Sequence, residues 1–158
     1  MKKLSVSMMF SLLLASLIGG AALASTKKPL PFKGSSKGVE TYQENGPTMS
    51  VTATGSGEAS QLGRYTVSYE VEVDLQTLAG TGLSAHFVAA NGDSLFAEGS
   101  GQATPTDDPT VVSIVETYTI TGGTGRFANA SGSFIVNRTA NLATGETSGS
   151  FDGTIVIP

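Results

Sequence analysis

The segment Tyr65-Thr66-Val67-Ser68-Tyr69-Glu70-Val71-Glu72-Val73-Asp74 alternates apolar and polar residues without interruption. In an extended chain successive side chains point to opposite faces, so the tyrosines and valines share one face and the polar residues share the other. A strand with one face in a core and the other in water has this pattern. The segment therefore predicts a half-buried β-strand, and because much of the chain repeats its pattern, it indicates an all-β fold.

Shorter alternating runs follow along the chain, and helical periodicity is almost absent. The apolar positions of these runs are Leu83, Ala85, Phe87 and Ala89; Leu95 and Ala97; Val112, Ile114, Tyr118 and Ile120; Phe134 and Val136; and Phe151, Ile155 and Ile157. Two weaker candidates lie around Val39–Gln43 and Met49–Ser56. Together with the first segment they predict eight strands.

The links between the predicted strands are short and rich in turn residues. They are Glu44–Pro47, Ala90–Asp93, Thr104–Pro109, Gly122–Gly125 and Ala143–Glu146. Asn91-Gly92 is typical of a type I′ hairpin turn, and Gly122-Gly123-Thr124-Gly125 predicts a tight reversal between the sixth and seventh strands. Links of this length favour strands that are neighbours in space as well as in sequence, which is an antiparallel meander.

We expect the meander to close into an all-β, single-domain, antiparallel eight-stranded β-barrel. Closure removes the exposed sheet edges, and the glycines within the predicted strands suit a strongly bent sheet. A two-sheet sandwich is the alternative, because alternation alone does not distinguish the two.

The N-terminus is typical of a secretory signal peptide over residues 1–24. Lys2 and Lys3 precede a long apolar run, and Ala22-Leu23-Ala24 has the small-residue pattern of a cleavage site before Ser25. The alternative is a transmembrane anchor. Residues 25–38 contain several Pro and Gly residues and predict a flexible lead-in, which leaves 39–158 for the barrel. We therefore expect an exported protein, periplasmic or extracellular, with no membrane span after cleavage.

The charge of the predicted mature chain disfavours a nucleic-acid partner. Without Lys2 and Lys3, 7 basic residues remain against 13 acidic ones. Four of the seven are lysines that precede residue 39. Binding to phosphates or to anionic membranes requires a basic surface, which this composition lacks. The negative charge favours a soluble exported protein.

Four runs of the chain resemble a group of uncharacterised exported bacterial proteins. They are Gly55–Thr66, Ala89–Leu95, Tyr118–Gly132 and Gly149–Ile155. Within the third run, the pattern Gly-Gly-Thr-Gly-x-Phe-x-x-Ala-x-Gly resembles the allene oxide cyclase and dirigent-like barrels. That resemblance implies an eight-stranded antiparallel barrel, in some members holding a small apolar ligand without a cofactor. No catalytic residue of those enzymes aligns with this sequence.

Candidate catalytic residues are few. His86, the only histidine, Tyr69 and Arg126 are the side chains that a cofactor-free reaction in the lumen would use. The alternation places His86 on the face opposite Leu83 and Phe87, where a surface residue is the simpler interpretation. For Arg126 the simpler interpretation is a solvated charge beside a turn.

Aromatic residues are candidates for lining a ligand cavity. They are Tyr65, Phe87, Phe96 and Phe134, although such residues more often fill a small barrel. The many alanines and glycines predict an interior of small side chains with room for a cavity.

Glu70, Glu72 and Asp74 share one strand face, a spacing that glycoside hydrolysis or calcium binding would accept. They lie opposite the apolar stripe, so we interpret them as a solvated face. We expect no metal and no cofactor, and the absence of cysteine excludes thiolate sites.

Three hypotheses for function follow. The first is a module that binds a small apolar molecule in the barrel lumen. The second is a cofactor-free cyclase or isomerase, and the third is a structural or surface-interaction protein with a filled lumen. The sequence favours a non-catalytic function over an enzyme, and it does not indicate the oligomeric state.

Overall fold

A computed structural model describes residues 27–158, and the signal peptide predicted over residues 1–24 lies outside them. The described part contains eight strands and one short 3-10 turn, η1. In chain order the elements are β1 (Leu30–Asn45), β2 (Thr48–Ala59), β3 (Gly63–Asp74), β4 (Ala79–Ala89), β5 (Ser94–Pro105), β6 (Val111–Gly123), η1 (Gly125–Phe127), β7 (Ser131–Asn141) and β8 (Glu146–Val156).

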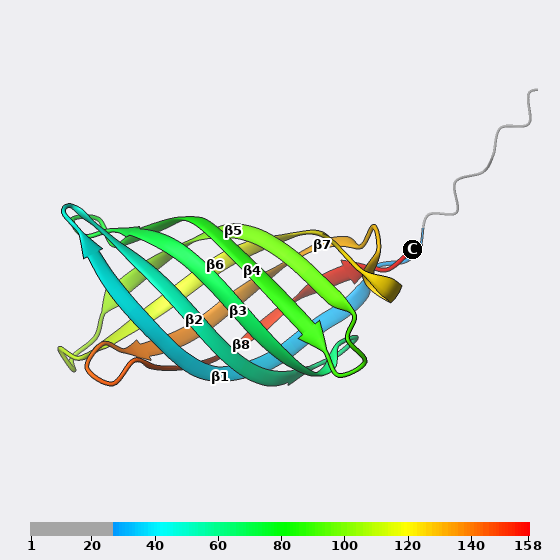
Figure 1. Cartoon of the computed structure of the whole chain (residues 1–158), viewed down its shortest axis with the longest axis horizontal. Coiled ribbons are helices and arrows are strands. Elements are labelled where there is room, and N and C mark those ends of the chain that lie inside the picture. Colours follow the sequence, from blue (N-terminus) through cyan, green and yellow to red (C-terminus); the bar gives the residue numbers. More distant parts are fainter. Residues whose placement is uncertain (1–26) are drawn as a thin grey trace, which may run out of the picture.

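The strands form a closed barrel in which each strand pairs antiparallel with its sequence neighbours (Figure 1). Closure comes from β1, which pairs with β8 from Leu30↔Ile155 to Val39↔Glu146. The prediction of an all-β, eight-stranded antiparallel meander barrel is confirmed, and the sandwich alternative is wrong. Within residues 27–158, no helix is long and apolar enough to cross a membrane.

The two ends of the barrel differ. We call the end that carries the β1–β2, β3–β4, β5–β6 and β7–β8 turns the loop end; it lies at the left of Figure 1. The opposite end, called the terminal end, carries η1 and the start and end of the described chain. The alternation of Tyr65–Asp74 places Tyr65 near the terminal end and Val73 near the loop end, both facing inward.

The flexible lead-in predicted over residues 25–38 is wrong from Leu30 onward, because β1 begins at that residue. Phe32 explains the difference, since its side chain is fully buried inside the barrel. The prolines and glycines that suggested a flexible segment lie in a strand whose backbone pairs with β8 and, from Gly34, also with β2.

The turn between β4 and β5 differs in detail from the predicted type I′ turn. In the β4–β5 turn only Gly92 has positive φ, so Asn91 does not adopt the type I′ conformation. Its side chain instead accepts a hydrogen bond from the Asp93 amide at 3.1 Å.

The tight reversal predicted at Gly122–Gly125 is also wrong. Strand β6 continues through Gly123, and residues 124–130 connect it to β7 through η1. The longer link allows Phe127 to fold into the core with no exposed surface.

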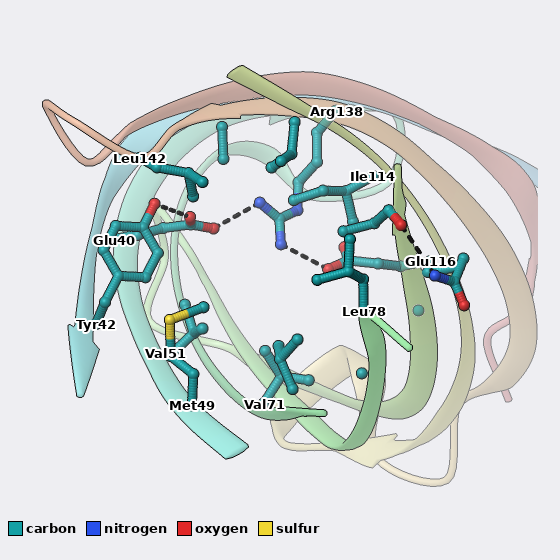
Figure 2. A pocket seen from close by; sticks show the side chains of 17 residues that line it. Glu40, Tyr42, Met49, Val51, Val71, Leu78, Ile114, Glu116, Arg138 and Leu142 are labelled. Atoms are coloured by element: carbon teal, nitrogen blue, oxygen red, sulfur yellow. Dashed lines mark hydrogen bonds and ion pairs between the residues drawn. The ribbon is translucent and has the colours of Figure 1, made fainter. Parts of the chain in front are cut away.

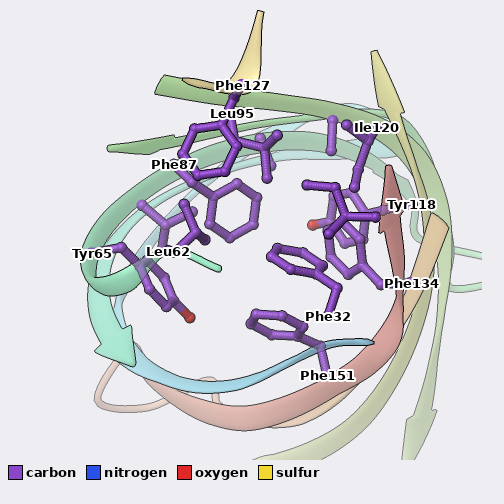
Figure 3. Close-up of a cluster of buried hydrophobic side chains, with 14 of the residues drawn as sticks. Phe32, Leu62, Tyr65, Phe87, Leu95, Tyr118, Ile120, Phe127, Phe134 and Phe151 are labelled. Atoms are coloured by element: carbon purple, nitrogen blue, oxygen red, sulfur yellow. The ribbon is translucent and has the colours of Figure 1, made fainter. Parts of the chain in front are cut away.

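Aromatic side chains fill the terminal half of the lumen (Figure 3). The ring centroids of Phe32 and Phe134 lie 5.2 Å apart, and those of Phe32 and Phe151 lie 5.0 Å apart. Tyr118 stacks on Phe134 at 4.9 Å with nearly parallel rings. The expectation of an interior made of small side chains therefore fails in this half, where packed rings leave little space.

A charged cluster and a cavity in the loop half of the lumen

Three charged side chains meet inside the barrel, at the boundary between the aromatic half and the loop half. They are Glu40 of β1, Glu116 of β6 and Arg138 of β7, and their side chains are only 2%, 4% and 7% exposed. The inward-facing register of the three strands brings them together, although Glu40 and Arg138 lie far apart in the sequence. We refer to these three residues as the charged cluster.

Arg138 lies between the two carboxylates (Figure 2). Its NH1 donates to Glu40 Oε1 at 2.5 Å and to Thr147 Oγ1 at 3.1 Å, and its NH2 donates to Glu116 Oε1 at 2.7 Å. Buried charges require this kind of pairing, because an isolated ion in a low-dielectric interior is strongly unfavourable.

Three tyrosines complete the polar layer. The hydroxyls of Tyr42 and Tyr69 donate to the two oxygens of Glu40 at 2.7 and 2.5 Å. The hydroxyl of Tyr118 lies 3.4 Å from Glu116 Oε2, a long contact. Glu40 thus accepts three short charge-assisted hydrogen bonds, whereas Glu116 accepts only one.

The environment keeps the three tyrosines and Arg138 in their usual protonation states at neutral pH. Burial raises the pKa of Tyr42, Tyr69 and Tyr118 well above the ordinary phenol value, so all three remain neutral donors. For Arg138, burial alone would lower the pKa. The hydrogen bond and charge of Glu116 are the main causes that outweigh burial and raise the pKa of the guanidinium.

A cavity of about 90 Å³ lies on the loop-end side of the charged cluster. Glu40, Glu116 and Arg138 line its floor, and Leu78 and the exposed Leu142 lie at its rim. Its walls are apolar and include Met49, Val51, Val71, Val73, Val112 and Ile114. Figure 2 shows this arrangement, with Val51 and Val71 across the lumen from Arg138.

A second, smaller cavity of about 40 Å³ lies on the other side of the same cluster. Its lining includes Tyr65, Tyr69, Phe87 and Tyr118 as well as Arg138. Its volume suffices for a few water molecules, which need about 10–15 Å³ each on this measure.

The predicted catalytic residues are not brought together. Tyr69 faces the lumen and touches the charged cluster, with its ring centroid 5.1 Å from Arg138 Cζ. His86 lies on the outer face of β4, where Nε2 hydrogen-bonds Ser94 Oγ at 2.9 Å, so its predicted place opposite the apolar stripe is confirmed. Arg126 is exposed at the terminal end, and its Cζ atom lies 4.6 Å from the ring centroid of Phe127. A lumenal role for His86 or Arg126 is therefore wrong.

Only two of the four aromatic residues predicted to line a ligand cavity border one of the two lumen cavities. Phe96 is 39% exposed on the outer face of β5, because Leu95 and Ala97 take the inward positions, so its assignment to the lumen is wrong. Phe134 is buried in the aromatic half and borders neither of the two lumen cavities. Tyr65 and Phe87 line only the smaller cavity.

The acidic stripe of β3 lies outside the barrel, as expected for a solvated face. Glu70 is exposed, and Glu72 accepts a hydrogen bond from Ser50 at 2.7 Å. Asp74 accepts hydrogen bonds from the Thr77 amide, the Thr77 hydroxyl and the Gln76 amide, which lower the pKa of its carboxyl. Within residues 27–158, no group of three or more His, Cys, Asp or Glu side chains is placed to hold a metal ion.

Sequence reasoning missed the charged cluster, although alternation contains the signal. Glu116 lies between Ile114 and Tyr118 at the same period-two positions, so it belongs to the inward face. Arg138 follows Phe134 and Val136 in the same way. A charged residue in phase with an apolar stripe indicates a buried polar site. Its partners follow only from the structure, since Glu116 and Arg138 lie on the paired strands β6 and β7, whereas Glu40 lies on β1, which pairs with β2 and β8.

No family model, no curated protein and no solved structure gives a significant match to this chain. The resemblance to exported bacterial proteins and to the allene oxide cyclase and dirigent-like barrels stays a prediction.

Proposed function

We propose that this protein binds a small, largely apolar molecule in the loop half of its barrel. The cavity above the charged cluster carries the proposal: its walls are aliphatic, its floor is polar, and its rim lies at the loop end. Small-molecule sites in proteins combine apolar walls with a few polar groups that orient the ligand. The packed aromatic half supports the same view, because it leaves the larger space of the lumen in the loop half.

An enzyme that acts without a cofactor is the second candidate, and the buried charged cluster is the observation that favours it. Of the three residues named from the sequence, only Tyr69 lines the lumen. Its hydroxyl is engaged by Glu40, and its pKa is raised, so it holds its proton at neutral pH. Its only proton is donated to Glu40 and it does not line the larger cavity, so Tyr69 offers no base for proton transfer there.

The third candidate, a structural protein with a filled lumen, has support from the aromatic half alone. We also propose, from the residue pattern of the N-terminus, that the protein is exported to the periplasm or the extracellular space.

A ligand screen with a cavity-filling variant tests the binding function. Val71→Phe places an aromatic ring in the cavity, and Val115→Phe is the control because Val115 is 49% exposed on the outer face. Ligands that bind the native state raise its melting temperature. We expect small aliphatic and aromatic molecules to stabilise the wild type and Val115→Phe but not Val71→Phe. Absence of stabilisation at saturating concentrations, or equal stabilisation of all three proteins, would refute the proposal.

A further inference from the structure

The larger cavity is apolar up to its rim at the loop end of the barrel. Leu142 at the rim is 44% exposed. Met49 and Val112, which line the wall near this end, are half-buried, whereas Val51 and Val71 further in are buried. An apolar chain that enters the cavity therefore also covers apolar surface at the rim, which adds to the favourable burial.

The charged cluster at the inner end of the cavity offers little to a polar group. NH1 and NH2 of Arg138 donate to Glu40 and Glu116 (Figure 2), and the three side chains are at most 7% exposed. A charged head group at this depth would lose its hydration without gaining comparable partners. We therefore expect the apolar end of a ligand to lie inside the cavity and its polar group to stay at the rim.

The ionisable side chains at the loop end all carry negative charge. Each of the four loop-end turns has a carboxylate in the turn or at an adjoining strand end, and none of these turns contains Lys, Arg or His. The carboxylates belong to Glu44, Asp74, Asp107, Asp108 and Glu146. Charges of one sign around the mouth of a low-dielectric cleft attract cations and repel anions.

The basic residues gather at the opposite end of the barrel. Apart from Arg138 in the charged cluster, every Lys and Arg of residues 27–158 lies in the terminal half or precedes β1. They are Lys27, Lys28, Lys33, Lys37, Arg64 and Arg126. The negative charge at the loop end is therefore a matter of placement and exceeds what the net charge of the chain implies.

We propose that the cavity takes the tail of a cationic aliphatic chain, an alkylammonium compound, whose head group stays among the carboxylates of the loop end. This inference rests on the proposed binding function and names its ligand class. The apolar walls favour the chain, and the sign of the charge around the opening favours the cationic head group. The volume of about 90 Å³ holds only a few carbon atoms, so a longer chain continues past Leu142.

Three compounds with the same octyl chain separate the tail from the head group: octyltrimethylammonium, octyl glucoside and octyl sulfate, each below its micelle concentration. Methyl NMR titrations follow Val51, Val71 and Ile114 in the cavity, with Leu95 and Ile155 of the aromatic core as the reference. At an ionic strength of about 0.01 M we expect the cation to bind about tenfold more tightly than the anion, with the glucoside between them. At about 1 M, where the Debye length is only about 3 Å, the difference should nearly vanish.

The trimethylammonium group also tests the orientation of the ligand, because it is bulky and donates no hydrogen bond. Octylamine should bind with a similar affinity, since in both compounds the head group lies outside the cavity. If octylamine shifts the cavity methyls and octyltrimethylammonium does not, the head group enters the cavity and the inference is overturned.

A triple variant tests the role of the loop-end carboxylates. Glu44→Gln, Asp107→Asn and Glu146→Gln together neutralise three exposed side chains around the opening. The preference for the cation over the anion should fall several-fold, while the affinity for octyl glucoside should stay the same.

A second triple variant with the same change in net charge is the control. Glu58→Gln, Glu70→Gln and Glu98→Gln neutralise exposed carboxylates elsewhere on the outer surface and should leave most of the preference. Equal losses in the two variants, or equal binding of the cation and the anion to the wild type at low ionic strength, would overturn the inference and leave the binding function standing. If none of the probes moves the cavity methyls, both are refuted.

Discussion

Arg138 is the residue on which the polar part of the lumen depends. Its guanidinium joins β1, β6 and β8 through Glu40, Glu116 and Thr147, and it neutralises one of the two buried carboxylates. Removing one partner of a buried ion pair leaves an uncompensated charge, which costs much more than the pair itself contributes.

We expect Arg138→Leu to lower the free energy of unfolding by about 3–5 kcal/mol, because Glu40 and Glu116 would remain buried without their counter-ion. Urea denaturation measures the change. Arg64→Leu is the control: the Arg64 side chain is 85% exposed and lies 3.9 Å from Glu58, so its loss should change stability by less than about 0.5 kcal/mol. Similar effects of the two substitutions would contradict the buried position of Arg138.

At the scale of single elements, inward-facing glycines allow neighbouring strands to approach closely. Gly99 of β5 pairs with Tyr118 of β6, and a Cβ atom at Gly99 would collide with the carbonyl oxygen of Thr117. The sequence prediction that glycines within strands mark bends is consistent with this crowding. Alternation alone does not identify which strand each glycine faces, since that requires the register.

We expect Gly99→Ala to destabilise the barrel by roughly 1–3 kcal/mol, the usual cost of inserting atoms into a packed site. Ser100→Ala, one residue away on the exposed face, should have little effect. Thermal unfolding followed by circular dichroism compares the two. Equal melting temperatures for both variants would show that β5 and β6 do not approach as closely as described.

The sequence predicts the number and order of the strands but not the start of β1 or the link after β6. Alternation and short links suffice for eight strands and their order, because period two and turn chemistry are local properties. The start of β1 at Leu30 was missed because its prolines and glycines suggested a loop, and only pairing with β8 orders this segment. The link after β6 was misjudged because burial of Phe127 is a tertiary effect.

For the whole molecule, the tyrosines link protonation to stability. Burial raises the pKa of all four: Tyr65 reaches about 12, and Tyr42, Tyr69 and Tyr118 lie higher. A group whose pKa is raised by folding contributes stability that is complete below its unfolded value and is lost as the pH rises through its folded value.

Stability should therefore be constant with respect to these groups up to about pH 10 and fall above it. Urea denaturation across this range measures the loss, and tyrosinate absorbance should rise together with unfolding. Tyr65→Phe removes one of the four contributions and should reduce the slope. Tyrosinate formation near pH 10 in a barrel that stays folded would contradict the buried positions of the hydroxyls.

The proposed export predicts a specific chain start. After expression in a bacterial host with an intact secretion pathway, N-terminal sequencing should find Ser25 as the first residue of the product. A variant with Ala22 and Ala24 replaced by bulky residues should retain the full N-terminus. A protein that begins at Met1 in both cases would refute the cleavage site.

The loop half of the lumen holds an apolar cavity, whereas the terminal half is filled. Diffraction from crystals pressurised with xenon distinguishes the two halves, because xenon binds in dry apolar cavities and does not enter packed cores. We predict xenon among Val51, Val71 and Ile114, above the charged cluster, and none in that place in Val71→Phe. Xenon among Phe32, Phe134 and Phe151, or no bound xenon at all, would contradict this distribution of space in the lumen.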